Sequence, residues 1–332
     1  MTPIPLILDV DTGVDDALAI LLALASPEVT LIAATTVMGN VDIEHTTENT
    51  LAVLELCGCG DVEVARGASR PLAGDYLAAP AVHGSRGLGR AELPPATRTP
   101  SDRDAARLLV ETARERPGEV QLVATGPLTN VALALAEEPD LPTLLLGFTT
   151  MGGAFVHQGN VTPAAEANIW WDPEAAQAVF RAFAGAPEPK LPVCVGLDVT
   201  ERVKLDRAGV EAMCAPAPES QLARFLQDAV PFYIEFYERY GSSGGASMHD
   251  PLALAISIDP SLAGLRSTRV EVDTDGTWTR GETVTDLREI RRTPWAGGWM
   301  PDDNVRVALD VDAPAFMARF IERLAALVEA QA

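Results

Sequence analysis

Short apolar runs alternate with helix-period segments along most of the chain, and this alternation limits the folds it can adopt. Strand-like runs lie at residues 4–8 and 29–37, and segments with helical periodicity follow them at 15–25 and 45–56. Strands that are apolar almost throughout are buried on both faces, which requires helices on both sides of a parallel sheet. The pattern predicts an α/β fold with a Rossmann-like open sheet, mostly parallel, and helices on both faces.

The alternation continues after a Gly- and Pro-rich stretch at residues 67–100. Further helices are expected at 102–116, 128–138 and 173–183, and further strands at 120–124, 144–151 and 191–199. The C-terminal third is less regular, with helices expected near 219–240, from 249 and near 313–330, and strand-like runs near 268–285 and 304–311. Since no repeat or low-complexity linker divides the chain, we expect a single domain over residues 1–332.

The charge balance excludes several classes of partner. The chain has 47 Asp and Glu against 25 Lys and Arg, a net charge of −22, which repels phosphate backbones and anionic lipid. The longest apolar stretch, 17–25, is shorter than the roughly 18 residues of a membrane span. The start MTPIPLILDV lacks the basic region of a signal peptide, and four Cys do not suggest a disulfide framework. We therefore expect a cytoplasmic protein that binds a small molecule, with no nucleic acid and no membrane as partners.

The strongest local signal is LILDVDTGVDDALAI at residues 6–20, which contains Asp9, Asp11, Asp15 and Asp16. A strand that enters a Gly turn and then a helix places its loop at the carboxyl end of the sheet, where open α/β proteins bind ligands. Four acids this close would repel one another unless a cation lay between them. Carboxylate oxygens without His or Cys suit Ca²⁺ or Mg²⁺ better than Zn²⁺.

Other polar motifs follow the later strands. They are Asn40 in TTVMGN, Thr125 in VATGPLTN, Asn160, Glu166 and Asn168 in GNVTPAAEANI, and His249 with Asp250 in MHDP. Each one alone would also fit a helix cap or a solvated loop. Together they place polar groups at the carboxyl ends of several parallel strands, as one binding site on such a sheet requires.

In this order the motifs resemble the calcium-dependent nucleoside hydrolases of the inosine-uridine preferring type. DVDTGVDDALAI is similar to the DxDxGxDD signature of that family, and TTVMGN, VATGPLTN, TMGGA, GN-x5-E-x-N-I and HDP follow over nearly the whole chain. The resemblance implies a single-domain α/β enzyme, a homodimer or homotetramer, that hydrolyses the N-glycosidic bond of ribonucleosides in nucleoside salvage. Its products would be ribose and the free nucleobase.

The resemblance also implies a role for each site residue. Ca²⁺ would be held by the carboxylates of Asp11, Asp16 and Asp250 and by the backbone carbonyl of Thr125. Asp15 would be the general base for the calcium-bound water, and His249 a candidate acid for the leaving base. The ribose would contact Asn40, Met151, Asn160, Glu166, Asn168 and Asp250, and His83 in the flap-like loop HGSRGLG would contact substrate. Asp9 would not bind the metal itself but would orient the residues that do.

Several alternatives stay open. We expect broad inosine and uridine specificity, and the alternatives are a pyrimidine-specific ribonucleoside hydrolase or a non-catalytic nucleoside-binding protein of the same fold. Ala167 stands where relatives commonly carry an aromatic residue, which leaves the base preference open. A magnesium-dependent phosphotransferase of the haloacid-dehalogenase type is disfavoured because Gly13 stands at the fifth position of its motif. A dinucleotide-binding oxidoreductase would need a GxGxxG after the first strand, which is absent.

Overall fold

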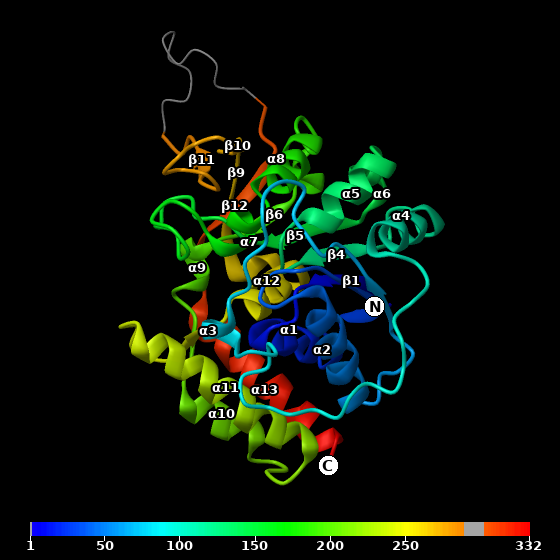
Figure 1. Cartoon of the computed structure of the whole chain (residues 1–332), viewed down its shortest axis with the longest axis vertical. Coiled ribbons are helices and arrows are strands. Elements are labelled where there is room, and N and C mark those ends of the chain that lie inside the picture. Colours follow the sequence, from blue (N-terminus) through cyan, green and yellow to red (C-terminus); the bar gives the residue numbers. More distant parts are fainter. Residues whose placement is uncertain (1, 289–301) are drawn as a thin grey trace.

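An eight-stranded sheet forms the centre of the structure, a computed structural model that describes residues 2–288 and 302–332 (Figure 1). In spatial order its strands are β3 (Glu63–Arg66), β2 (Val29–Thr36), β1 (Ile4–Val10), β4 (Gln121–Ala124), β5 (Gly147–Met151), β6 (Val193–Val195), β12 (Val305–Val311) and β9 (Ala263–Thr268). Every neighbouring pair is parallel except β12 and β9. The predicted fold class, an open and mostly parallel sheet, is confirmed.

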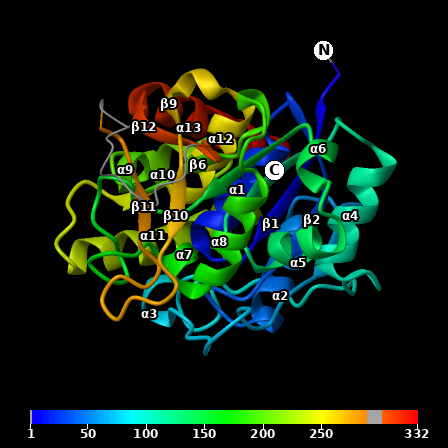
Figure 2. The ribbon, with the colours of Figure 1, turned by 90° about the horizontal axis from the view of Figure 1, so that it is seen from above.

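Helices cover both faces of this sheet, as Figure 2 shows from above. The core on one face includes side chains from α1 (Val14–Leu24), α2 (Ile43–Leu56), α11 (Gln221–Arg239), α12 (His249–Ile258) and α13 (Ala313–Ala330), of which α11 and α13 pack on α1. The core on the other face includes side chains from α4 (Ala105–Glu115), α5 (Thr129–Glu137) and α8 (Pro173–Ala182). Strand β1 serves both cores, because successive side chains of a strand point to opposite faces. Leu6, Leu8 and Val10 enter the first core and Ile7 enters the second. This double burial explains the nearly continuous apolar runs.

The order of the strands creates a crevice beside β1. From β1 the chain builds β2 and β3 outward on one side, and it then returns to place β4 on the other side of β1. The loops that leave β1 and β4 therefore run in opposite directions. In open α/β sheets such a reversal leaves room for a ligand at the carboxyl ends of the strands.

The remaining elements are short. They are α3 (Pro80–His83), α6 (Leu141–Leu144), α7 (Ala167–Trp171), α9 (Leu197–Thr200), α10 (Arg207–Cys214), the 3-10 turns Glu188–Lys190 and Pro260–Leu262, and the strand pairs β7 (Lys204–Leu205) with β8 (Ala246–Ser247) and β10 (Val270–Val272) with β11 (Thr283–Thr285). Within the described residues, no helix has both the length and the apolar character needed to cross a lipid bilayer.

Two predicted strands had wrong bounds. The apolar run at 191–199 was expected to be one strand, but β6 ends at Val195 and α9 begins at Leu197. Asp198 lies in α9, and its carboxylate accepts hydrogen bonds from the backbone N–H groups of Phe155, Val156 and His157 in the segment after β5. The run at 144–151 becomes a strand only at Gly147, because α6 occupies its start. Both runs are largely apolar, and apolar character alone does not separate a buried strand from a buried helix.

Candidate active site

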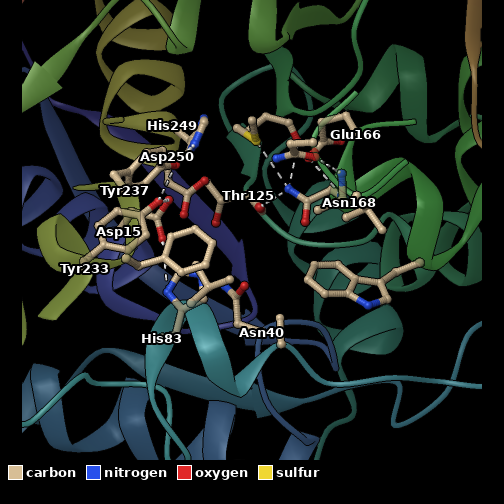
Figure 3. Close-up of a pocket in the computed structure, with 18 of the residues that line it drawn as sticks. Asp15, Asn40, His83, Thr125, Glu166, Asn168, Tyr233, Tyr237, His249 and Asp250 are labelled. Carbon is tan, nitrogen blue, oxygen red and sulfur yellow. Dashed lines mark hydrogen bonds and ion pairs between the residues drawn. The ribbon is translucent and has the colours of Figure 1, made fainter. Parts of the chain in front are cut away.

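A pocket opens at the carboxyl ends of β1, β4 and β5, beside the crevice that the strand order creates (Figure 3). Ten of the predicted site residues line it: Asp15, Asn40, His83, Thr125, Met151, Asn160, Glu166, Asn168, His249 and Asp250. Asp11 and Asp16 do not line the pocket, but both hydrogen-bond to Asn40, which does. The structure thus brings together motifs that are up to 235 positions apart, Asp15 and Asp250.

The turn between β1 and α1 is held by Asp16. Its carboxylate accepts hydrogen bonds from the backbone N–H of Gly13, at 2.9 Å, and of Asp11, at 3.3 Å. It also accepts from the Thr125 hydroxyl, at 2.7 Å, and from the side-chain amide of Asn40, at 3.1 Å. One buried carboxylate therefore connects the chain segments that follow β1, β2 and β4.

Asp11 lies in the same cluster, and the backbone of Gly39 and Asn40 passes close to its carboxylate. Its Oδ2 accepts the backbone N–H of Asn40 at 2.7 Å. A Cβ atom on Gly39 would lie 1.9 Å from that oxygen, so only glycine fits there. The other oxygen, Oδ1, is buried and has no hydrogen-bond partner within the described residues.

Carboxylate oxygens converge at the inner end of the pocket. Asp15, Asp16 and Asp250 each offer one oxygen, and these three atoms lie within 4.8 Å of one another. The Oδ1 atom of Asp15 is buried without a hydrogen-bond partner, like that of Asp11. Two of the predicted metal ligands Asp11, Asp16, Asp250 and Thr125 belong to this triad, namely Asp16 and Asp250, and Asp15 is its third member. Thr125 lines the same pocket, and its carbonyl accepts the side-chain N–H of Asn168 at 2.6 Å.

These carboxylates destabilise one another's charged forms. Burial raises the pKa of Asp15 to about 8 and that of Asp9 to about 7, and it also raises the pKa of Asp11 and Asp250, with neighbouring carboxylates adding to the effect. Among the described residues that line the pocket there is no Lys or Arg. A bound cation would favour the charged forms, and these oxygen donors fit a hard divalent ion such as Ca²⁺ or Mg²⁺.

Asp9, like Asp11 and Asp16, does not line the pocket. It is fully buried on β1, where its Oδ1 accepts the Thr35 hydroxyl at 2.6 Å and the Asn130 side-chain amide at 2.7 Å. Asn130 also donates to the backbone carbonyl of Thr36. Asp9 thus connects β1 to β2 and α5, and it supports the strands from which the site residues project.

One side of the pocket is formed by the segment after β5, and Glu166 fixes its shape. Glu166 precedes α7 and accepts hydrogen bonds from the backbone N–H groups of Gly153, Asn168 and Ile169. Burial raises the pKa of Glu166 to about 7. Asn168 donates to the carbonyls of Thr125 and Met151, whereas Asn160 is exposed at the rim and accepts the backbone N–H of Ala167.

The opposite side is formed by aromatic rings and two histidines (Figure 3). The Tyr233 hydroxyl donates to Asp15 Oδ2 at 3.1 Å, and the ring of His83 stacks on Tyr233 with centroids 5.2 Å apart. His249 Nε2 lies 2.7 Å from the Tyr237 hydroxyl, and its Nδ1 lies 2.8 Å from the Thr200 hydroxyl. Burial lowers the pKa of His83 to about 3 and that of His249 to about 4, so both rings are neutral near pH 7.

Several lining residues were not assigned to the site from the sequence. The sequence left open whether Tyr233 and Tyr237 line the base pocket, because their helical spacing also fits core packing, and Glu201, Trp171 and Phe236 gave no motif. The available signal for Glu201 was its position, because it lies two residues after the apolar run 191–199 and so at the same edge of the sheet as the other site residues.

The structure is an α/β protein with an acidic pocket at the carboxyl ends of its parallel strands, and the comparisons with known proteins identify its family. The model of the inosine-uridine preferring nucleoside hydrolases matches residues 6–318, and the chain belongs to that family. Uridine nucleosidase 1 of Arabidopsis thaliana is 38% identical over 309 residues, 92% of this chain and 89% of that protein. A pyrimidine-specific ribonucleoside hydrolase of Enterobacter sp. is 40% identical over 324 residues, 97% and 98% of the two chains.

A solved structure extends the likeness to three dimensions. The purine-preferring ribonucleoside hydrolase from Gardnerella vaginalis has a TM-score of 0.89 and 35% identity, and the match covers 98% of this chain and 99% of that one. The predicted reaction class is confirmed: this chain is a hydrolase of ribonucleosides. The haloacid-dehalogenase alternative is thereby excluded.

Removal of one carboxylate of the triad tests the cation site without a measurement of turnover. We expect CaCl₂ or MgCl₂, added after chelation, to raise the thermal midpoint of the wild type by about 5 °C, because an ion that binds only the folded state stabilises it. Asp250→Asn should abolish the rise, since Asp250 contributes one of the three convergent oxygens and is also one of the predicted metal ligands. Asp228→Asn, an exposed control on α11, should keep it. An equal rise in both variants would contradict the site.

Proposed function

We propose that this enzyme cleaves uridine and inosine to ribose and free base, with Ca²⁺ held by the buried carboxylate cluster. The observation that carries the proposal is the convergence of oxygens from Asp15, Asp16 and Asp250, with a buried and unpartnered Asp11 oxygen in the same cluster. The carboxylates of Asp11, Asp16 and Asp250 and the Thr125 carbonyl would hold the ion. When bound, Ca²⁺ supplies positive charge that makes water a stronger acid and the ribose hydroxyls easier to orient.

A carboxylate must take a proton from the attacking water, and two carboxylates meet this requirement. In Asp15 and in Asp11, one oxygen accepts a hydrogen bond while the other is buried without a partner. Asp15 lines the pocket and Asp11 does not, so Asp15 is the first candidate for the general base and Asp11 the second. Tyr233 fixes the Asp15 carboxylate through its hydroxyl, which leaves Oδ1 free for water.

The ribose lies, in this proposal, between the acidic cluster and the segment after β5. Asn40 and Asn168 offer side-chain amides there, Asp250 a carboxylate oxygen and Met151 an apolar surface, while Asn160 reaches the ribose from the rim. Both oxygens of Glu166 already accept backbone N–H groups, so Glu166 would share them with a hydroxyl. Several such contacts fix the anomeric carbon against the attacking water. Negative charge nearby stabilises the oxocarbenium-like transition state.

The departing base would meet the aromatic side of the pocket. His249 is neutral near pH 7 and is hydrogen-bonded to Tyr237, so an N–H or O–H donor of this pair can face the leaving nitrogen. Donation to the base lowers the barrier because a free nucleobase anion is a poor leaving group. His83, which stacks on Tyr233, closes the same side above Asp15 and would contact substrate.

The first experiment measures reducing-sugar release from uridine, inosine, cytidine and adenosine. We expect release from uridine and inosine, loss of release after calcium is removed with a chelator, and recovery when calcium is restored. Restoration by magnesium alone would contradict the assignment of the ion. If the folded, calcium-loaded protein releases no sugar from any nucleoside, the enzyme proposal fails and a nucleoside-binding protein is the better description.

Asparagine variants separate the two candidate bases. Asp15→Asn should lower kcat by about 10² to 10⁴-fold, the usual contribution of a positioned general base, and leave the calcium-induced rise in thermal midpoint intact. Asp11→Asn should reduce that rise, because Asp11 is proposed as a ligand. If Asp15→Asn abolishes the rise while Asp11→Asn keeps it and loses turnover, the two roles are exchanged.

A homodimer or homotetramer in the cytoplasm is also part of the proposal, and the resemblance to the family is its only support. Light scattering coupled to size-exclusion chromatography gives the mass of the assembly directly. We expect two or four times the 35.2 kDa of one chain. A single peak at the mass of one chain would contradict this part of the proposal and leave the catalytic part untouched.

A further inference from the structure

Glu201 is a carboxylate at the aromatic end of the pocket for which the reaction described above has no role. It follows α9 directly, lines the pocket, and its side chain is 24% exposed. Its Oε1 lies 4.0 Å from His249 Nε2, the ring proposed to face the leaving base. Glu201 therefore lies at the end where the nucleobase would sit, and it is not a member of the cluster of Asp15, Asp16 and Asp250.

The two oxygens of Glu201 are in different situations. Oε2 accepts hydrogen bonds from the Lys204 ammonium, at 2.7 Å, and from the Ser247 hydroxyl, at 3.0 Å. Lys204 also donates to Ser247 and lies over the Tyr237 ring, 4.9 Å from its centroid. Oε1 takes part in none of these hydrogen bonds. The side chain is thus fixed at Oε2, while Oε1 keeps its lone pairs for a group inside the pocket.

This carboxylate is ionised at neutral pH. Partial burial acts to raise the pKa of Glu201, but the charges and hydrogen bonds of its neighbours together hold it below the ordinary value. An ionised carboxylate accepts hydrogen bonds and cannot donate them. The Oε1 position therefore favours a ligand that presents an N–H group and disfavours one that presents a lone pair.

We propose that Glu201 determines the base specificity of this enzyme by accepting the ring N–H of a nucleobase in which that N–H adjoins a carbonyl. This inference rests on the proposed function. Uracil and hypoxanthine carry such an N–H. Cytosine and adenine have an unprotonated ring nitrogen at the corresponding position, and its lone pair would face the Glu201 oxygen. The Tyr237 hydroxyl, next to His249, is a donor that suits the adjoining carbonyl.

Glu201→Gln reverses the polarity of this position. Lys204 and Ser247 both donate to Oε2, so the amide oxygen of glutamine takes that place and its NH₂ group takes the place of Oε1. The pocket then presents a donor where the wild type presents an acceptor. The substitution keeps the size and shape of the side chain and lies outside the acidic cluster.

The experiment compares kcat/KM for uridine, 3-methyluridine, 5-methyluridine and cytidine in the wild type and in Glu201→Gln. 3-Methyluridine lacks the ring N–H, and 5-methyluridine keeps it and carries its methyl group elsewhere. We expect the wild type to favour uridine over 3-methyluridine and over cytidine by about 30-fold, the worth of a hydrogen bond to a charged group, and to accept 5-methyluridine. In the variant, the uridine-to-cytidine ratio should fall by a similar factor. Glu219→Gln, an exposed control, should keep the wild-type ratios.

The outcomes separate this inference from the proposed function. If the wild type hydrolyses none of the four nucleosides, the proposed function fails. If it hydrolyses uridine and 3-methyluridine equally well, or if Glu201→Gln lowers kcat/KM for every substrate by one common factor, Glu201 has no part in base selection. The wild-type comparison of the two methylated nucleosides needs no variant, so equal hydrolysis of uridine and 3-methyluridine would overturn the inference even if Glu201→Gln does not fold.

Discussion

The structure depends on burying several like charges at one point. Asp11, Asp15, Asp16 and Asp250 are each at most 4% exposed, and their mutual repulsion opposes folding. Two features offset it. Backbone and side-chain donors from three different loops hydrogen-bond to Asp11 and Asp16, and the N-terminal turns of α1 and α12 carry Asp15, Asp16 and Asp250, where the helix dipole favours negative charge. What remains uncompensated is the pair of unpartnered oxygens on Asp11 and Asp15, and a divalent cation would compensate it.

The sheet topology explains why these charges can be gathered without loss of the core. The strand order puts β1 beside β4, and the loops that follow them separate, so the polar groups lie at the sheet edge while Leu6, Ile7 and Leu8 remain fully within the two cores. Asp9 connects the two regions, because it lies on β1 and binds Thr35 and Asn130. The acidic site thus directly follows a strand that is packed in both cores, and this packing fixes the position of the acidic side chains.

The sequence predicts the parts of this arrangement that are local. Alternation of apolar runs with helical periods predicts the parallel sheet, and the spacing of four acids in LILDVDTGVDDALAI predicts a charged turn at its edge. The aromatic end of the pocket was not predictable in the same way. The hydrogen bond between Tyr233 and Asp15 spans 218 positions, and the contact of Tyr237 with His249 joins α11 to the first residue of α12. Helical spacing of tyrosines is the same for a packed face and for a pocket wall, so only the three-dimensional structure distinguishes them.

The two ends of the pocket are held by different means, and this difference bears on how specificity can vary. At the acidic and ribose end, Asp11, Asp16 and Glu166 are fixed by backbone N–H groups, so a substitution there disturbs the chain itself. At the aromatic end, side chains hold one another: Lys204 and Ser247 fix Glu201, and Tyr237 and Thr200 fix His249. A single replacement at this second end can change which hydrogen-bonding groups line it and leave the backbone around the acidic cluster in place. The base preference can therefore change while the reaction stays the same, as it does between the pyrimidine-specific and purine-preferring hydrolases to which this chain is similar.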